Sequence, residues 1–134
     1  GIYAAGDIAS FYDPMIGRHH QIGTWDNAAG HGLVAARNMA GIPEDYLDIP
    51  TYTTTLFGSS MAVLGITGGL PGLESVRDFS YEKRYYRKLF FYNDCLVGAV
   101  LIGPPKGRKK LIEIIRARQV VDRPRNHYLD PARL

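Results

Sequence analysis

One run of residues predicts the centre of the fold: YYRKLFFY at 85–92, the pair Asn93-Asp94, and CLVGAVLI at 95–102. Both outer segments are rich in the aromatic and β-branched residues that favour strands. Asn and Asp tolerate the positive φ angles of a two-residue turn, so the run predicts a β-hairpin. The second segment is apolar on both faces, and we therefore expect it to lie inside a sheet. Pro104-Pro105 ends this strand.

The segments around the hairpin predict a small α+β domain, an antiparallel sheet with one C-terminal helix. Residues 51–57, 59–66 and 75–81 have the composition of strands. Residues 107–120 repeat apolar side chains at helical spacing, with Leu111, Ile112, Ile115 and Gln119 expected on the inner face. The polar, proline-containing residues 122–134 predict an irregular tail.

The N-terminal part has a different pattern, which predicts a strand, a polar loop and a helix. Residues 1–9 resemble a short buried strand followed by a tight turn, and 10–23 a loop. Thr24 is a suitable N-cap for a helix that ends near Ala40, before Gly41. We expect this helix to pack through small side chains, namely Ala28, Ala29, Gly32, Ala36 and Ala40. Because the chain opens inside a strand and without methionine, we expect it to be a fragment.

Composition narrows the function classes. The net charge of +3 over 134 residues is mild, so nucleic acid and membrane surfaces are not expected as partners. The only cysteine, Cys95, excludes an internal disulfide and fits the reducing cytoplasm. Adjacent histidines at 19 and 20, with His31, lack the spacing of a metal site.

The residues Tyr3-Ala4-Ala5-Gly6-Asp7 carry the chemistry of greatest interest. A strand that ends in Ala-Ala-Gly has little side-chain bulk, so a ligand can approach its backbone closely. An aspartate at the carboxyl end of such a strand can accept hydrogen bonds from sugar or polyol hydroxyls. The alternative is that Asp7 only caps the next turn.

This run resembles the second FAD fingerprint of the pyridine nucleotide-disulfide oxidoreductase superfamily, whose form is apolar-Tyr/Phe-Ala-x-Gly-Asp. The stretch WDNAA at 25–29, with Gly32 and AARN at 35–38, resembles the helix that follows the fingerprint. The resemblance implies FAD as cofactor, with Asp7 on the ribityl chain and Gly6 giving close approach. It also implies that the backbone amides of Asp26, Asn27 and Ala28 face the flavin.

The hairpin is similar to the interface domain of the same superfamily, most closely in NADH-dependent rubredoxin, ferredoxin and nitrite reductase-type flavoproteins. The resemblance implies a remnant of an FAD-binding α/β domain at 1–44, a linker at 45–51 and an interface domain at 52–121. It further implies a homodimer formed through that domain. The parent protein would pass electrons from NAD(P)H through flavin to an external acceptor.

The chain lacks the motifs with which such enzymes bind pyrophosphate groups and carry out dithiol chemistry. The chain has no Gly-x-Gly-x-x-Gly turn for a pyrophosphate and no Cys-x-x-Cys, so we expect neither tight cofactor binding nor turnover from the fragment alone. A non-enzymatic interaction or dimerisation module is the alternative. One basic set is either a solvated helix face or a docking surface for an acidic electron carrier: Lys106, Arg108, Lys109, Lys110, Arg116 and Arg118.

Overall fold

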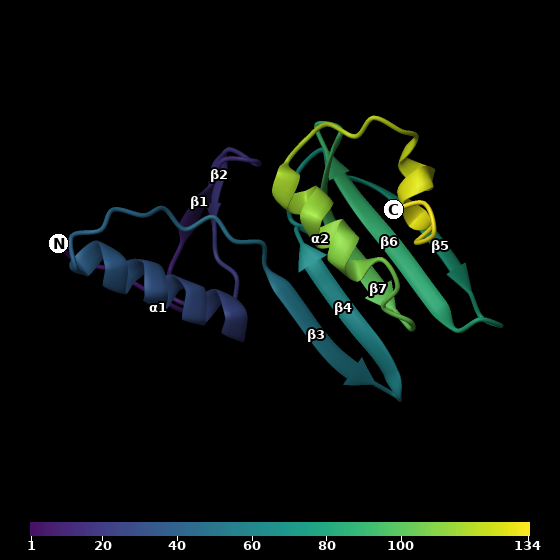
Figure 1. Cartoon of the computed structure of the whole chain (residues 1–134), viewed down its shortest axis with the longest axis horizontal. Helices are drawn as coiled ribbons and strands as arrows, with labels where there is room; N and C mark the ends of the chain where they lie inside the picture. The colour runs from purple at the N-terminus through teal and green to yellow at the C-terminus, as the bar shows by residue number, and fades with distance from the viewer. The chain divides into compact units, whose positions relative to one another are not determined.

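The computed structural model describes all 134 residues, and the chain divides into two compact units. Unit 1 is Gly1–Thr51 and unit 2 is Tyr52–Leu134 (Figure 1). Unit 1 contains a small two-stranded sheet and one helix, and unit 2 contains a five-stranded antiparallel sheet and a second helix. The predicted α+β fold class is confirmed.

Unit 1 begins without the strand that residues 1–9 predict. Gly1–Ala5 belong to no sheet and are exposed, including the side chains of Ile2 and Tyr3. A strand requires a neighbour to satisfy its backbone N–H and C=O groups, and no strand pairs with this segment. The turn that follows is present, since the Ala9 N–H donates to the Gly6 carbonyl at 2.9 Å.

The predicted loop at 10–23 contains a short hairpin instead. Strand β1 (Phe11–Asp13) pairs antiparallel with β2 (Arg18–His20). Asp13 organises the turn: its Oδ1 accepts from the Met15 N–H at 2.8 Å, and its carbonyl accepts from the Gly17 N–H at 3.0 Å. Such aspartate turns depend on local side-chain geometry rather than on hydrophobic alternation, which is why the sequence pattern missed the hairpin.

Helix α1 (Trp25–Met39) begins and ends as its sequence predicts. The Thr24 hydroxyl accepts from the Asn27 N–H at 3.3 Å, which is a helix N-cap. At the other end, Gly41 has φ +79°, and the Ile42 N–H donates back to the Arg37 carbonyl at 2.9 Å. Together with the hydrogen bond from the Gly41 N–H to the Asn38 carbonyl at 3.0 Å, this bond forms a Schellman motif. A glycine directly after a helix favours this termination.

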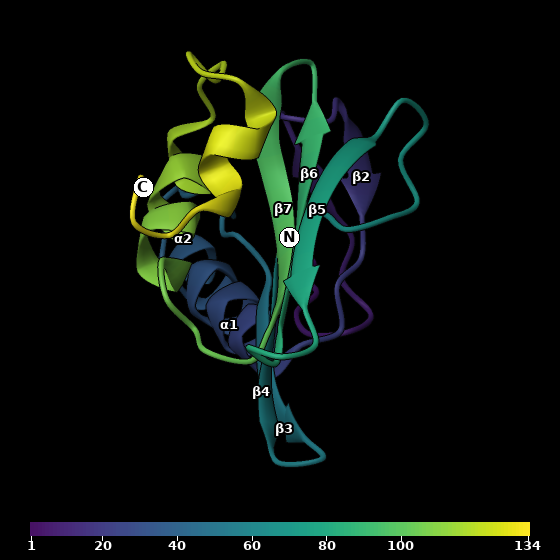
Figure 2. The same cartoon turned by 90° about the vertical axis from the view of Figure 1, so that its right-hand side faces the viewer.

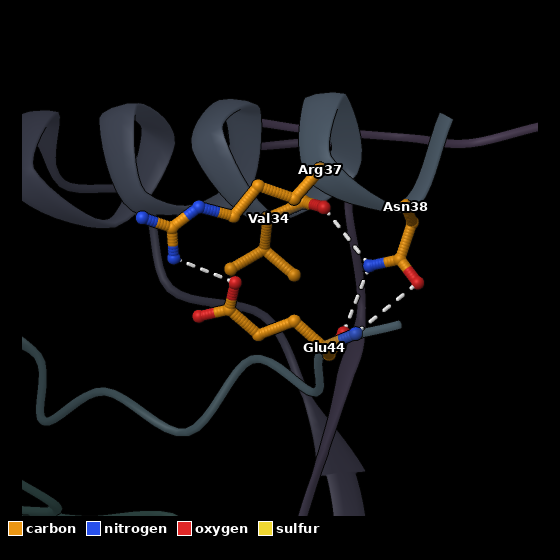
Figure 3. A network of polar contacts seen from close by, with 4 residues as sticks. All are labelled: Val34, Arg37, Asn38 and Glu44. Carbon is orange, nitrogen blue, oxygen red and sulfur yellow. Dashed lines mark hydrogen bonds and ion pairs between the residues drawn. The ribbon is translucent and has the colours of Figure 1, made fainter. Parts of the chain in front are cut away.

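The chain after α1 folds back onto the last turns of the helix (Figure 3). The Asn38 Nδ2 donates to the carbonyls of Val34 at 2.9 Å and Glu44 at 2.8 Å. Arg37 Nη1 pairs with the Glu44 carboxylate at 2.7 Å. This network fixes the direction of residues 42–46 along the helix.

The inner face of α1 differs from the stripe of small residues that the sequence predicts. The buried residues are Asn27, His31 and Ala35, which recur at intervals of four. Ala29, Ala36 and Ala40 are exposed, and so are the larger side chains of Trp25 and Leu33, at 93% and 55%. Within unit 1, the aromatic side chains of Phe11 and Tyr46 pack on His31 of this buried stripe.

Unit 2 is built around the predicted hairpin (Figures 1 and 2). The strands β3 (Thr51–Leu56), β4 (Ser59–Gly65), β5 (Glu74–Ser80), β6 (Tyr85–Tyr92) and β7 (Cys95–Ile102) are arranged in the order β3-β4-β7-β6-β5. Strand β7 is therefore central, as its apolar pattern predicts. Asn93 and Asp94 have φ of 47° and 56°, the positive values expected of the turn.

The core of unit 2 lies between the sheet and the helix α2 (Arg108–Ala117). Leu89, Phe91, Leu96 and Leu111 are fully buried, and Ile115 of α2 is 4% exposed. The approach of two backbones beside the central strand leaves no room for a side chain at Gly98, where a Cβ would lie 1.9 Å from the Ile66 carbonyl oxygen. This contact brings the end of β4 directly against β7.

Two predictions at the C-terminal end are wrong in detail. Helix α2 ends at Ala117 rather than near Val120, because Arg118 adopts φ 52° and Val120 then forms a bridge with Cys95. The tail is not irregular throughout, since it contains the 3₁₀ helix η1 (Arg125–Leu129) with Tyr128 and Leu129 buried. Ion pairs from Arg125 to Glu74 and Asp94 hold η1 against β5.

Candidate functional site

The Gly6–Asp7 turn lies beside the N-terminal end of α1. Gly6 has φ +83°, and a Cβ at this position would lie 3.9 Å from the Cβ of Ala28. A Cβ added to Gly23 would lie 3.2 Å from Asp7 Oδ2, so the carboxylate sits against the backbone just before the Thr24 cap. Gln21 Nε2 donates to the Ile8 carbonyl at 3.1 Å and ties the turn to the same region. The fold thus brings Gly6, Asp7 and the start of α1 together.

The Asp7 side chain is exposed and makes no hydrogen bond or ion pair. It does not cap the turn, whose one backbone hydrogen bond joins Ala9 to Gly6. A carboxylate near the positive end of a helix is electrostatically favoured, and its oxygens remain available to hydroxyl donors. The geometry therefore allows the ligand-binding role and removes the reason to assign a capping role.

The amides of the first turn of α1 are only partly available. The Asn27 N–H donates to the Thr24 hydroxyl, and the Ala28 N–H donates to the Thr24 carbonyl at 2.9 Å. The amides of Trp25 and Asp26 remain as the orphan donors that a helix N-terminus presents. Asn27 and Ala28 can therefore act on a nearby anion only through the summed dipole of the helix.

The two polar side chains of this turn differ in exposure. The Asp26 carboxylate accepts from the Thr51 hydroxyl at 3.4 Å and is exposed. Asn27 is 1% exposed, and its Nδ2 finds no acceptor. Asn27 is part of the buried stripe of α1 and not a surface residue of the N-terminus.

Sequence reasoning missed a cluster of aromatic and polar side chains in the interior of unit 1. The ring of Phe11 lies 4.3 Å from that of His20 and 5.0 Å from that of Tyr46, measured between centroids. His31 packs edge-on against Tyr46 at 4.1 Å. A Cβ at Gly30 would lie 2.8 Å from the Tyr46 ring, so the glycine is what lets the ring reach the helix. The histidines and Gly30 were visible in the sequence, but their partners come from the unpredicted hairpin and from residue 46.

Burial sets the protonation of this cluster. Desolvation raises the pKa of Tyr46 to about 12, with further contributions from Asp48 and Asp26. Desolvation also lowers the pKa of His20, although Asp13 Oδ2 at 3.6 Å opposes the shift. Both rings are thus held neutral near pH 7, as a packed interior requires.

The basic residues of unit 2 lie on and around α2. Lys109 and Lys110 are exposed, and Lys110 pairs with Glu113 at 3.2 Å. Leu111 and Ile115 occupy the buried face, so the cationic side chains project from the other side of the helix. The six residues of the set differ in exposure, because Lys106, Lys109, Lys110 and Arg116 are exposed whereas Arg108 and Arg118 are half-buried.

A family of known proteins matches the segment that forms most of unit 2. The model of the rubredoxin NAD+ reductase C-terminal domain matches residues 50–119, more than half of the chain. The chain belongs to this family. The resemblance to rubredoxin and ferredoxin reductases that the hairpin indicates is confirmed.

One curated relative is a component of a dioxygenase system. The ferredoxin--NAD(+) reductase component of the anthranilate 1,2-dioxygenase system of Burkholderia cepacia is 31% identical over 67 residues, which are 50% of this chain and 16% of that protein. The oxidoreductase and flavoprotein class expected from the sequence agrees with this finding.

Solved structures share the fold across both units. The covalent putidaredoxin reductase–putidaredoxin complex matches with a TM-score of 0.79 and 17% identity, over 96% of this chain and 30% of that chain. The ferredoxin reductase for the CYP199A2 system of Rhodopseudomonas palustris matches with a TM-score of 0.79 and 17% identity, over 96% and 31%. The chain spans less than a third of each of these proteins.

The structure contains neither a membrane-spanning helix nor a cluster of metal ligands. Neither helix has the length and apolar character needed to cross a bilayer. The side chains of His, Cys, Asp and Glu nowhere gather in a group of three that could hold a metal ion, and His19 packs on Tyr12 rather than beside His20.

Proposed function

We propose that this chain is the C-terminal portion of an FAD-dependent NAD(P)H oxidoreductase that passes electrons to an external acceptor. The observation that carries the proposal is the exposed Asp7 carboxylate held beside the N-terminus of α1. Membership of the reductase family through residues 50–119 supports it independently. The chain spans only part of its relatives, so turnover belongs to the whole protein and not to this chain alone.

The residues of unit 1 fit the role of a partial flavin site. Asp7 would accept hydrogen bonds from the ribityl hydroxyls, and the turn at Gly6 keeps side-chain bulk away from them. The orphan amides of Trp25 and Asp26, with the dipole to which Asn27 and Ala28 contribute, would stabilise negative charge. When bound, FAD supplies the acceptor for hydride and the route for single electrons, which no side chain provides.

The domain organisation follows from the same proposal. Residues 1–44 are the remnant of the FAD-binding domain, 45–51 the linker, 52–121 the interface domain and 122–134 the tail. We place the protein in the cytoplasm, because its one cysteine is unpaired. The homodimer formed through the interface domain remains part of the proposal.

The external acceptor in this proposal is an acidic electron-carrier protein that docks on the basic side chains of α2. One structural relative is a reductase in complex with its carrier, putidaredoxin. Lys109 and Lys110 are exposed and can attract an acidic partner over a Debye length. In the whole enzyme, Lys109→Glu with Lys110→Glu is expected to slow electron transfer and to flatten its salt dependence, while Arg84→Glu, at an exposed cation outside α2, serves as control. An unchanged salt dependence argues against the docking surface.

The flavin role of Asp7 is tested by the flavin content of the purified whole protein. Asp7→Ala removes a charged acceptor of hydrogen bonds and is expected to weaken FAD binding about tenfold or more. Asp45→Ala is the control, because Asp45 is another exposed carboxylate of unit 1. Equal FAD affinity in the two variants contradicts the assignment of Asp7.

A further inference from the structure

Unit 2 also contains a cleft, and Lys106 is the one member of the basic set that lines it. Its volume is about 700 Å³, in the range of sites for small organic molecules. Strands β5 and β6 form one side, and η1 with the residues after it forms another, so the C-terminal tail completes the cleft. A Cβ at Gly107 would lie 2.7 Å from Leu134 Cδ1, which shows how closely the tail packs there.

The cleft is lined by an excess of positive charge. Five cationic residues contribute to it: Arg77, Lys83, Arg87, Lys106 and Arg133. Only two carboxylates face them, and both are already engaged. Asp78 accepts from the Tyr85 hydroxyl at 2.7 Å, and Asp130 pairs with Arg133 at 3.1 Å. No carboxylate of the chain forms an ion pair with Arg77, Lys83 or Lys106.

Arg87 is the unusual member of this group because it is buried. It is 5% exposed, and its Nη1 donates to the Lys106 carbonyl at 2.8 Å. Its Nε and Nη2 are shielded from water and have no acceptor. Desolvation lowers the pKa of Arg87, the charges of Asp130 and Asp78 oppose this shift without donating or accepting a hydrogen bond with the guanidinium, and arginine stays charged near pH 7. A buried cation with two unsatisfied N–H groups is costly unless an anion pairs with it.

We propose that this cleft binds a phosphate-type oxyanion, with the Arg87 guanidinium as its central ligand. The Nε and Nη2 donors form the planar fork that matches two oxygens of a phosphoryl group. The exposed cations Arg77, Lys83 and Lys106 supply the charge that a dianion needs, beyond what a monovalent carboxylate requires. The volume exceeds that of a bare ion and leaves room for an organic group attached to the phosphate.

Access to Arg87 requires movement at the rim of the cleft. The Arg133 side chain is 64% exposed, and its pair with Asp130 is a surface ion pair that opens at low cost. Lys83 is also exposed and free to rotate toward an entering anion. Binding is therefore expected to perturb residues 130–133 of the tail together with β6.

The test is calorimetric titration of the full 134-residue chain at constant ionic strength with inorganic phosphate, adenosine monophosphate and acetate as probes. We expect saturable binding of phosphate or the nucleotide and none of acetate. Tighter binding of the nucleotide identifies an organic phosphate as the ligand, and equal affinities identify the free ion; both support the oxyanion site. Acetate binding as tight as phosphate, or no saturable binding of any probe, overturns the proposal.

Variants locate the site. Arg77→Ala with Lys83→Ala removes two exposed cations of the cleft and is expected to weaken phosphate binding about tenfold or more. Lys109→Ala with Lys110→Ala removes the same charge from α2 and is expected to leave the affinity within about twofold, since exposed distant charges are screened. Arg87→Met tests the central ligand, with circular dichroism to verify folding. Equal weakening by both double variants shows a non-specific charge effect and contradicts the assignment.

Discussion

The two units of the chain bury their apolar side chains to different degrees. Six of the seven largest fully buried side chains belong to unit 2, among them Phe91, Leu64 and Leu89, and the only one from unit 1 is Asn27. Both units expose large apolar side chains, but unit 1, the shorter of the two, has nine of the sixteen, including Ile2 and Trp25. The fully buried core therefore lies almost wholly in unit 2, whereas unit 1 exposes proportionally more of its large apolar side chains.

Helix α1 of unit 1 also has one buried face and one exposed face. Its buried stripe, Asn27, His31 and Ala35, lies inside unit 1, while Ala29, Ala36, Ala40 and Leu33 are exposed. Small side chains on a helix allow a close approach to another backbone, which is the arrangement that the sequence predicts for this face. We take the outward face to be the surface on which the remainder of the proposed FAD-binding domain packs.

Among the substitutions that compare the two units, Gly98→Ala in unit 2 is expected to change the free energy of unfolding most. The new Cβ would collide with the Ile66 backbone, so β7 and β4 must separate, and we expect a loss of about 2–3 kcal/mol in the free energy of unfolding. Gly32→Ala in α1 is the control, because its Cβ meets nothing within 4 Å and is expected to stabilise by up to about 1 kcal/mol. Urea unfolding of both variants measures this. A Gly98→Ala variant as stable as wild type contradicts the close approach.

A smaller effect concerns the attachment of the tail to unit 2 and depends on pH. The hydrogen bond from Arg125 lowers the pKa of Glu74 below its unfolded value of 4.5. The pair therefore adds stability above that pH and loses it as the pH falls through the lower folded pKa. We expect Glu74→Gln to lower the urea midpoint near pH 7 and to match wild type in strong acid. A difference that persists in acid shows that Glu74 acts by something other than its charge.

The smallest effect is expected at Tyr46 in unit 1. Its hydroxyl is buried without a partner, so Tyr46→Phe is expected to be neutral or slightly stabilising near pH 7. The raised pKa favours the neutral ring in the folded state, a contribution present below pH 10 and lost between pH 10 and about 12. Absorbance titration at about 295 nm is expected to lose one late phase in the variant. If the variant instead loses amplitude from the main phase near about pH 10, the ring is not buried.

The sequence predicted those elements whose signals are local and strong. Asn93-Asp94 between two apolar runs predicts the β6–β7 hairpin. Thr24 and Gly41 predict the two ends of α1. The prediction of a strand at residues 1–9 was wrong, because a strand forms only where a neighbouring strand pairs with it, whatever its own composition. The end of α2 failed because Val120 pairs with Cys95, a contact between residues distant in sequence.

The candidate site shows the same division. Asp7 was found from a short motif, and the fold placed it beside the predicted helix start. Which amides remain free could not be read from the sequence, because that depends on how Thr24 uses its hydroxyl and carbonyl. The role of Arg87 was equally hidden, since nothing in a strand sequence shows that one arginine will be buried beneath the C-terminal tail.

The central claim is tested most directly by the absorbance spectrum of the longer protein that we propose contains this chain. The account predicts a yellow protein with two bands between about 350 and 500 nm that bleach when NADH or NADPH is added. A colourless and well-folded protein that cannot be reconstituted with FAD would contradict it.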